Sequence, residues 1–327
     1  MLFTEELNRV GYISRSVPTD KDLRTLILEL KKQKNAVILA HYYVSAEIQE
    51  LADVVGDSLA LAHAAKKTDA DIILFCGVHF MAETAKILNP SKKVLLPDLN
   101  AGCSLADSTP TADFEAFKSA HPGAVVVSYI NCSAEVKAMS DIICTSSNAV
   151  EVVNSIPSDK KIIFAPDKNL GTYVAKQTGR DLILWDGACV VHVNISIDKL
   201  IALQTRFPEA QLIAHPECES EILDRAHFIG STKALIEYAK VSPVNTFIIA
   251  TEAGILYKMR ELVPEKKLIP APALETNSCA CSECPYMKMN TLEKVFNALY
   301  YELPEITLSD EIIKKASVAM NNMMALK

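Results

Sequence analysis

The cysteines are the residues of this chain whose type and spacing most clearly offer chemistry. Nine occur among the 327 residues, and nothing in the sequence points to secretion, so we do not expect a disulfide framework. Four of them lie in or beside apolar, strand-like runs: Cys76, Cys132, Cys144 and Cys218. The other five stand in loop-like segments: Cys103, Cys189, Cys279, Cys281 and Cys284.

One cysteine from each of the three loop segments would supply three thiolates. Soft sulfur ligands favour iron–sulfur clusters and zinc. A [4Fe–4S] cluster held by three cysteines leaves one iron without a protein ligand, and that iron could act as a Lewis acid on a substrate hydroxyl or carboxylate. The spacing alone fits ordinary loop cysteines about as well. The run C-A-C-S-E-C at 279–284 also suits zinc or a thiol pair.

A second set of reactive side chains stands where short apolar runs end. These runs predict buried strands, and the residues that follow them can supply hydrogen bonds and acid/base groups. The set comprises His41, Tyr43, Tyr129, Asn131, His215 and Glu217.

Three short triplets follow at a constant distance: G-D-S, C-T-S and G-S-T, ending at Ser58, Ser146 and Thr232. Each triplet precedes a helical pattern, so we expect these three hydroxyl residues to be N-caps. A helix N-terminus also attracts anions through its free N–H groups and its dipole. Three such ends facing one centre would form a site for phosphate or carboxylate in a chain of net charge −7.

These elements recur because the chain repeats one unit three times. His41 and Ser58 are 17 residues apart, and the pairs Tyr129/Ser146 and His215/Thr232 have the same separation. Each unit reads as β-α-β-α-β, with a cysteine after its third strand. We expect domains at 1–105, 106–190 and 191–284, with the segment 285–327 packing on the first.

Alternating strands and helices predict an α/β fold with short parallel sheets between layers of helices. In such sheets functional residues gather beyond the carboxyl ends of the strands. A pseudo-threefold arrangement of three α/β/α sandwich units would bring these ends to one centre.

Composition excludes several other classes. An excess of acidic residues argues against a nucleic-acid or membrane-surface protein, and no apolar run approaches the roughly 18 residues of a membrane helix. The common Gly-rich phosphate loops and the H-E-x-x-H and G-x-S-x-G signatures are absent. The first residues have no signal-peptide pattern, so we expect a cytoplasmic location.

The sequence resembles the quinolinate synthase family of bacterial and archaeal NAD biosynthesis over nearly its whole length. The stretches that carry the resemblance are AHYY, FCGVHFMAETAKIL, LPDLNAGCSLADS, TSSNAV, PDKNLG, HPEC, GST and CACSECPYMKMNTLEKV. The resemblance implies three α/β sandwich domains around a [4Fe–4S] cluster. It also implies condensation of iminoaspartate with dihydroxyacetone phosphate to quinolinate, phosphate and two waters.

The resemblance also implies roles for individual residues. The cluster ligands would be Cys103, Cys189 and Cys284, the last because it precedes the Pro-aromatic-Met run. Substrate would be bound by His41, Ser58, Tyr129, Asn131, Ser146, His215, Glu217 and Thr232. The catalytic groups would be His41, Tyr43, Tyr129, His215 and Glu217. The family pattern leads us to expect an acidic residue soon after His192, but Val193 and Asn194 follow, so His192 receives no role.

Two other classes of protein remain open on the residues alone. One is an iron–sulfur redox sensor or electron carrier, and the other is a repeat scaffold that holds structural zinc. The pair Cys281 and Cys284 has the C-x-x-C spacing of a redox switch, although incidental loop cysteines fit as well. A transient partner that supplies iminoaspartate is also expected.

Overall fold

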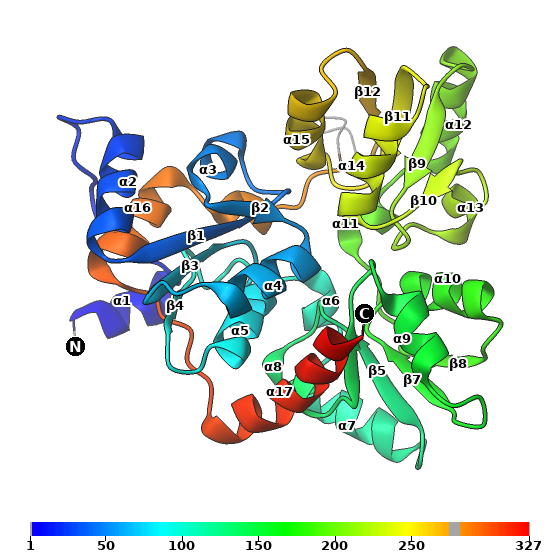
Figure 1. Ribbon diagram of the computed structural model, residues 1–327, viewed down its shortest axis with the longest axis horizontal. Helices are drawn as coiled ribbons and strands as arrows, with labels where there is room; N and C mark the ends of the chain where they lie inside the picture. The colour runs from blue at the N-terminus through cyan, green and yellow to red at the C-terminus, as the bar shows by residue number, and fades with distance from the viewer. Residues whose placement is uncertain (1, 275–281, 327) are drawn as a thin grey trace. The chain divides into compact units, whose positions relative to one another are not determined.

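The computed structural model describes residues 2–274 and 282–326 (Figure 1). The chain forms two compact units. The first consists of Met1–Cys103, Ser133–Ala138 and Pro285–Met320, and the second of Ser104–Cys132, Met139–Cys284 and Asn321–Lys327. Cys279 and Cys281 lie outside the described residues, so the proposed C-x-x-C switch is described only at its second member, Cys284.

The first unit contains one parallel sheet of order β2-β1-β3-β4. Its strands are β1 (Ala36–His41), β2 (Val54–Gly56), β3 (Ile72–Cys76) and β4 (Lys93–Leu95). Its helices are α1 (Leu2–Val10), α2 (Leu23–Gln33), α3 (Ala46–Leu51), α4 (Ser58–Lys67), α5 (His79–Leu88), α8 (Ala134–Ala138) and α16 (Leu292–Tyr301), with the 3₁₀ turn η1 (Met287–Met289).

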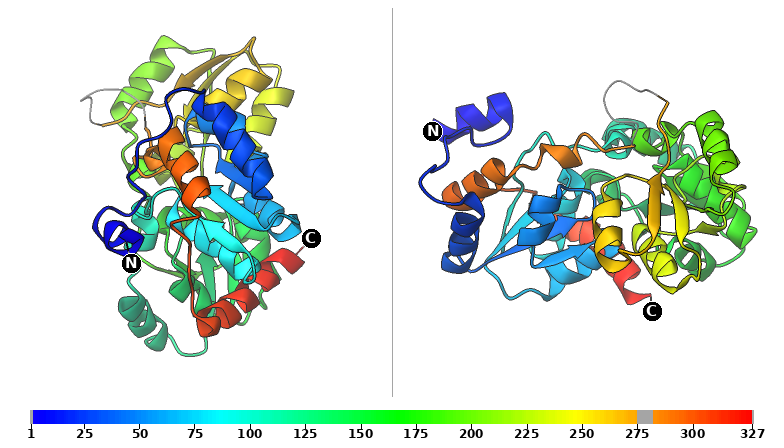
Figure 2. Two further views of the ribbon diagram at one scale, coloured as in Figure 1. Left: turned by 90° about the vertical axis from the view of Figure 1, so that its left-hand side faces the viewer. Right: turned by 90° about the horizontal axis from the view of Figure 1, so that it is seen from above.

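Helices cover both faces of this first sheet. The views in Figures 1 and 2 place α2 and α16 side by side on one face, and α4 packs with α5 on the other. Every residue of β3 (Ile72–Cys76) is buried, as expected for a strand covered on both sides. The sequence I-I-L-F-C therefore shows an unbroken apolar run instead of an alternating one.

The second unit contains two parallel sheets of the same plan, β6-β5-β7-β8 and β10-β9-β11-β12. The strands of the first are β5 (Val125–Tyr129), β6 (Ile142–Cys144), β7 (Ile162–Ala165) and β8 (Leu182–Leu184). Those of the second are β9 (Gln211–Ala214), β10 (Phe228–Ile229), β11 (Thr246–Ala250) and β12 (Lys267–Pro270). The helices of this unit are α6 (Ser104–Asp107), α7 (Thr111–Ser119), α9 (Ala149–Ser155), α10 (Lys168–Thr178), α11 (Val190–Val193), α12 (Ile197–Arg206), α13 (Ser220–Leu223), α14 (Thr232–Val241) and α15 (Ile255–Leu262). The last helix of the chain, α17 (Asp310–Ala325), begins in the first unit and ends in the second.

The three sheets confirm the prediction of an α/β fold built from three similar parts. Each sheet has one strand more than the β-α-β-α-β pattern predicts. The added strands β2 and β6 end at the first residue of their triplets, and β10 ends just before its triplet. These added strands are two or three residues long. A run this short shows no period that distinguishes a strand from the end of a helix.

The prediction that Ser58, Ser146 and Thr232 are N-caps is wrong. The cap of α4 is Asp57, whose side chain accepts from the N–H of Ala60, and the cap of α14 is Ser231, which accepts from Ala234. Ser58 and Thr232 are instead the first helical residues, so their hydroxyls are not the capping groups. Ser146 lies ahead of α9, which begins at Ala149.

In the first and third repeats the helix begins at the last residue of the triplet, whereas in the second repeat it begins three residues later. The glycines of two triplets explain this difference. A Cβ at Gly56 would lie 2.9 Å from the Cβ of Ala60, and a Cβ at Gly230 would lie 2.8 Å from that of Ala234. Because these two positions lack a side chain, α4 and α14 can begin two residues after the glycine without a steric clash. Cys144 occupies the same position in the second repeat, and there the helix starts later.

Candidate active site

Two predicted site residues of the second unit meet directly. Tyr129 ends β5 and Glu217 follows β9, so each stands at the carboxyl end of a strand in a different sheet. The Tyr129 hydroxyl donates a hydrogen bond to Oε1 of Glu217 at 2.5 Å. Both side chains are almost fully buried. A phenol that donates to a buried carboxyl is a suitable pair for transferring a proton.

His215 is held in one tautomer by its own backbone turn. Its Nδ1 accepts from the N–H of Glu217 at 3.4 Å, so the proton of the neutral ring is on Nε2. That Nε2 lies 3.2 Å from Oγ of Ser146 and can donate to it. Burial lowers the pKa of His215 to about 4, and nearby His192 acts in the same direction against the opposing charge of Glu217. His215 is therefore a neutral hydrogen-bond donor at pH 7.

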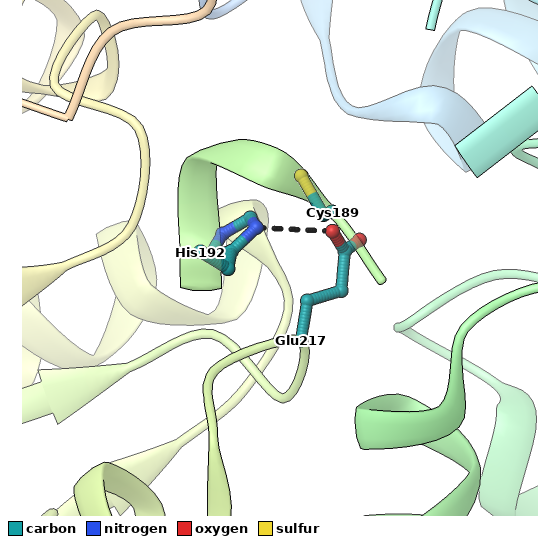
Figure 3. Close-up of side chains that lie close together, drawn as sticks. All are labelled: Cys189, His192 and Glu217. Atoms are coloured by element: carbon teal, nitrogen blue, oxygen red, sulfur yellow. Dashed lines mark ion pairs between the residues drawn. The ribbon is translucent and has the colours of Figure 1, made fainter. Parts of the chain in front are cut away.

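His192 belongs to the same cluster, although the sequence assigned it no role. It lies on the short helix α11, and its Nδ1 is 3.0 Å from Oε2 of Glu217 (Figure 3). Its Nε2 is 3.0 Å from the Thr251 hydroxyl, and its ring stacks on that of His215 with centroids 4.9 Å apart. The signal in the sequence was its place three residues after Cys189, which puts both residues on one side of a helical turn.

The charge of Glu217 is set by these neighbours. Burial acts to raise the pKa of this carboxyl, but His192, His215 and the Tyr129 hydroxyl outweigh it and hold the pKa below its usual value. Glu217 is therefore an anion inside a buried site, able to accept a proton.

A second buried carboxyl lies close to Glu217. Asp167 caps α10 and accepts from the N–H groups of Asn169 and Leu170 through Oδ1. Burial and the charge of Glu217 raise the pKa of Asp167 well above its usual value. Two neighbouring carboxyls thus differ in their preferred protonation state, which is an arrangement typical of active sites.

The thiols fall into two classes by exposure. Among the described cysteines, four are buried and three are half-buried, and the half-buried ones are Cys103, Cys189 and Cys284. Burial raises the pKa of the thiols of Cys76, Cys144 and Cys218, which makes them poor metal ligands. The three loop cysteines therefore have the accessible sulfur atoms that a metal centre needs.

Within the second unit, Cys189, His192 and Glu217 converge from α11 and from the turn after β9 (Figure 3). Their ligand atoms all lie within 4.8 Å of one another, so this group could bind a metal. Sulfur and imidazole ligands suit zinc and iron.

The predicted site residues of the first unit show the same local geometry. His41 ends β1, and its Nδ1 accepts from the N–H of Tyr43 at 3.3 Å, as His215 does in its own turn. The rings of His41 and Tyr43 pack edge to face with centroids 4.4 Å apart. Lys288 donates to the carbonyl oxygen of Tyr43, which ties the segment before α16 to this turn. Ser58 begins α4 in the same unit.

Asn131 and Thr232 complete the predicted set in the second unit. Thr232 is buried at the start of α14. The Oδ1 atom of Asn131 is buried and accepts no hydrogen bond from the part of the chain that the structure describes. A buried acceptor without a donor is uncommon in a folded protein, and a ligand is one way of satisfying it.

The fold and the buried acid/base cluster define an α/β enzyme that carries polar and thiol groups beyond the carboxyl ends of parallel strands. Residues 25–325 match the model of the quinolinate synthetase A protein family. The chain is 60% identical over 305 residues to the quinolinate synthase of Trichormus variabilis, covering 93% of this chain and 94% of that protein. It is 56% identical over 318 residues to the quinolinate synthase of Trichodesmium erythraeum, covering 97% of each. The chain belongs to the quinolinate synthase family.

Family membership agrees with the resemblance seen in the sequence. It establishes an enzyme of quinolinate synthesis and, with it, of NAD biosynthesis. In the part of the chain that the structure describes, no helix combines the length and apolarity needed to cross a membrane.

Proposed function

We propose that this enzyme condenses iminoaspartate with dihydroxyacetone phosphate to give quinolinate, phosphate and two waters. The supporting observation is the buried contact between Tyr129 and Glu217 with His192 beside it. A condensation followed by two dehydrations needs groups that take up and return protons where water is excluded. Membership of the family supports the choice of reaction.

We further propose that Cys103, Cys189 and Cys284 hold a [4Fe–4S] cluster. Their half-buried thiols are chemically suited to it, whereas the buried thiols are not. When bound, a cluster with three protein ligands supplies one iron that can act as a Lewis acid towards a substrate oxygen.

The anionic Glu217 is the proposed general base, which takes a proton from the substrate. The Tyr129 hydroxyl would give its own proton to a leaving oxygen and would be reprotonated by the Glu217 carboxylic acid. The Nε2–H of His215 orients the Ser146 hydroxyl or a substrate oxygen. In the first unit, His41 and Tyr43 form a pair that we assign to proton transfer and binding.

The remaining proposed roles are in binding. The anionic groups of the substrates would be bound by two residues at helix starts, by one hydroxyl that lies ahead of α9 and by one amide: Ser58 and Thr232, Ser146, and Asn131. The buried Oδ1 of Asn131 would accept a hydrogen bond from the substrate. Helix starts provide free N–H groups for carboxylate or phosphate oxygens.

A cytoplasmic location and a transient partner that supplies iminoaspartate complete the proposal. The imine hydrolyses readily, so delivery close to this enzyme would limit its loss. The three domains 1–105, 106–190 and 191–284 remain a prediction of the repeats.

An anaerobic assay with both substrates tests the proposal. The expected result is formation of quinolinate by protein that contains iron and sulfide, and a changed EPR spectrum of the reduced cluster on adding either substrate. Iron–sulfur protein without turnover would favour the electron carrier or redox sensor, and colourless zinc protein would favour the repeat scaffold.

A further inference from the structure

The carboxyl end of β11 carries a buried acidic residue that has no role in the proposed function. Glu252 lies two residues beyond the end of this strand, and its side chain is 0% exposed. Burying a carboxyl group is costly unless hydrogen bonds replace the lost water. The hydrogen-bond partners of Glu252 therefore indicate the structural role of this buried carboxyl group.

Both carboxyl oxygens of Glu252 accept from backbone N–H groups in two different segments. Oε2 accepts from the N–H of Gly254 at 2.6 Å, within the turn that follows the strand. Oε1 accepts from the N–H of Cys284 at 3.0 Å, across 32 residues of sequence. The side chain thus connects the end of β11 to the segment that carries Cys284.

A backbone contact strengthens the same connection. The N–H of Ala253 donates to the carbonyl oxygen of Ser282 at 2.9 Å. Two hydrogen bonds, running in opposite directions, therefore hold residues 282–284 against residues 252–253. The position of the Cys284 backbone depends on the turn that Glu252 organises.

We propose that Glu252 is a positioning residue that fixes the Cys284 backbone for metal binding. This inference rests on the proposed function in one respect, the assignment of Cys284 as a cluster ligand. Glu252 does not touch substrate or metal in this role, and it acts through the N–H of Cys284. Groups that orient metal ligands in this way typically alter metal affinity about 10- to 100-fold when they are changed.

The two donors explain why the residue is an acid and not an amide. A carboxyl group offers an acceptor oxygen to each N–H, whereas Gln offers one oxygen and one NH₂ group. In Glu252→Gln the NH₂ group would face either the Gly254 or the Cys284 N–H, and one contact would be lost. The shorter Glu252→Asp side chain would reach the two donors less well.

The test compares full-length wild type, Glu252→Gln and Glu252→Asp, all purified anaerobically. Glu6→Gln is the matched control, because Glu6 is also a buried glutamate that accepts from a backbone N–H, that of Ser14, and it lies outside the residues matched by the family model. The first measurement is hydrogen–deuterium exchange of the peptide that contains Cys284. The second is the rate at which a chelator removes iron.

Under the proposal, both Glu252 variants exchange faster at the Cys284 peptide and release iron about 10- to 100-fold faster, with Gln the more severe. Exchange elsewhere in the second unit stays at the wild-type level, and Glu6→Gln matches wild type in both measurements. Wild-type exchange and iron release in both Glu252 variants would overturn the proposal. Faster exchange spread over the whole unit would also overturn it, because it would show a general structural role.

The two proposals can fail separately. Wild-type protein that binds no iron would refute the cluster, and local exchange at Cys284 would then decide the role of Glu252 alone. If iron is bound and iron release is unchanged while local exchange rises, Glu252 orders the segment without affecting the metal, and the positioning role is rejected.

Discussion

The Tyr129 hydroxyl donates to Oε1 of Glu217 across 88 residues of sequence. Tyr129 is the residue of the second repeat that corresponds to His41 and His215. Glu217 belongs to the third repeat and lies two residues after His215, at the position that corresponds to Tyr43 and Asn131. The contact therefore joins unlike positions of the repeated unit. Because the two positions carry different side chains, the contact has one proton donor, Tyr129, and one proton acceptor, Glu217.

Replacing Glu217 tests the proposed base. Glu217→Gln keeps the shape of the side chain and removes its ability to accept a proton. We expect kcat to fall by about 100-fold or more while iron content stays at the wild-type value. Steady-state kinetics and iron analysis of the same preparation measure this, and wild-type turnover would remove Glu217 from the mechanism.

Tyr129→Phe tests the electrostatics of the pair. The hydroxyl lowers the pKa of Glu217, so its loss should raise that pKa. Activity that needs the anionic carboxylate would then be lost at a higher pH than in wild type. The pH profile of kcat measures the shift, and superimposable acidic limbs in the two proteins would contradict this account.

His215 predicts a pH dependence of stability. Its pKa is about 4 in the folded chain and about 6.5 in the unfolded chain, so between these values only the unfolded chain binds the proton. The free energy of unfolding should therefore decrease as the pH falls from 6.5 to 4. In His215→Gln this contribution is absent, and the decrease between pH 6.5 and 5 should be smaller by about 2 kcal/mol. Anaerobic urea unfolding at several pH values measures the difference, and equal slopes for both proteins would count against it.

Thr251 tests the place of His192 in the site. Its hydroxyl lies 3.0 Å from Nε2 of His192, which faces Glu217 with its other nitrogen. We expect Thr251→Val to lower kcat about tenfold with little change in KM or iron content, because the imidazole loses the partner that orients it. Thr251→Ser keeps the hydroxyl and should restore the rate. Equal rates for the Val and Ser variants would show that the hydroxyl has no such function.

The cysteines can be tested one by one. Changing Cys103, Cys189 or Cys284 to Ala should abolish the visible absorption of the cluster and all turnover. Cys76→Ala, at a fully buried thiol, should retain both and serves as the control.

Cys279→Ala and Cys281→Ala should retain the cluster as well. Loss of the cluster in either of these variants, combined with its retention in Cys284→Ala, would show that the ligand of the third loop was assigned to the wrong cysteine.

The sequence was sufficient to predict the architecture because its signals are local and repeated. Apolar runs such as Ile72–Cys76 and Thr246–Ala250 are buried strands, and the constant spacing from His41 to Ser58 marked three equivalent parts. It also separated the loop cysteines from the buried ones, since a cysteine inside an apolar run packs as a small hydrophobic residue.

The sequence did not predict the shortest strands or the helix N-caps, because each of these features depends on only one to three residues. The short strand Phe228–Ile229 has no readable period, and Ser231 takes the capping position instead of Thr232. Neighbouring polar residues compete for a cap, and the choice depends on how closely Gly230 allows the helix to approach its strand.

The sequence by itself determined which residues stand at strand ends, and the tertiary structure decided which of them meet. No sequence pattern predicts that Tyr129 donates to Glu217, or that His192 lies against both Glu217 and Thr251. Nor does any pattern predict that the N–H of Cys284 donates to Glu252. Strand ends are specified by a few neighbouring residues, because apolar runs and turns form locally. Contacts between strand ends depend on how the sheets pack, and that is a property of the whole core.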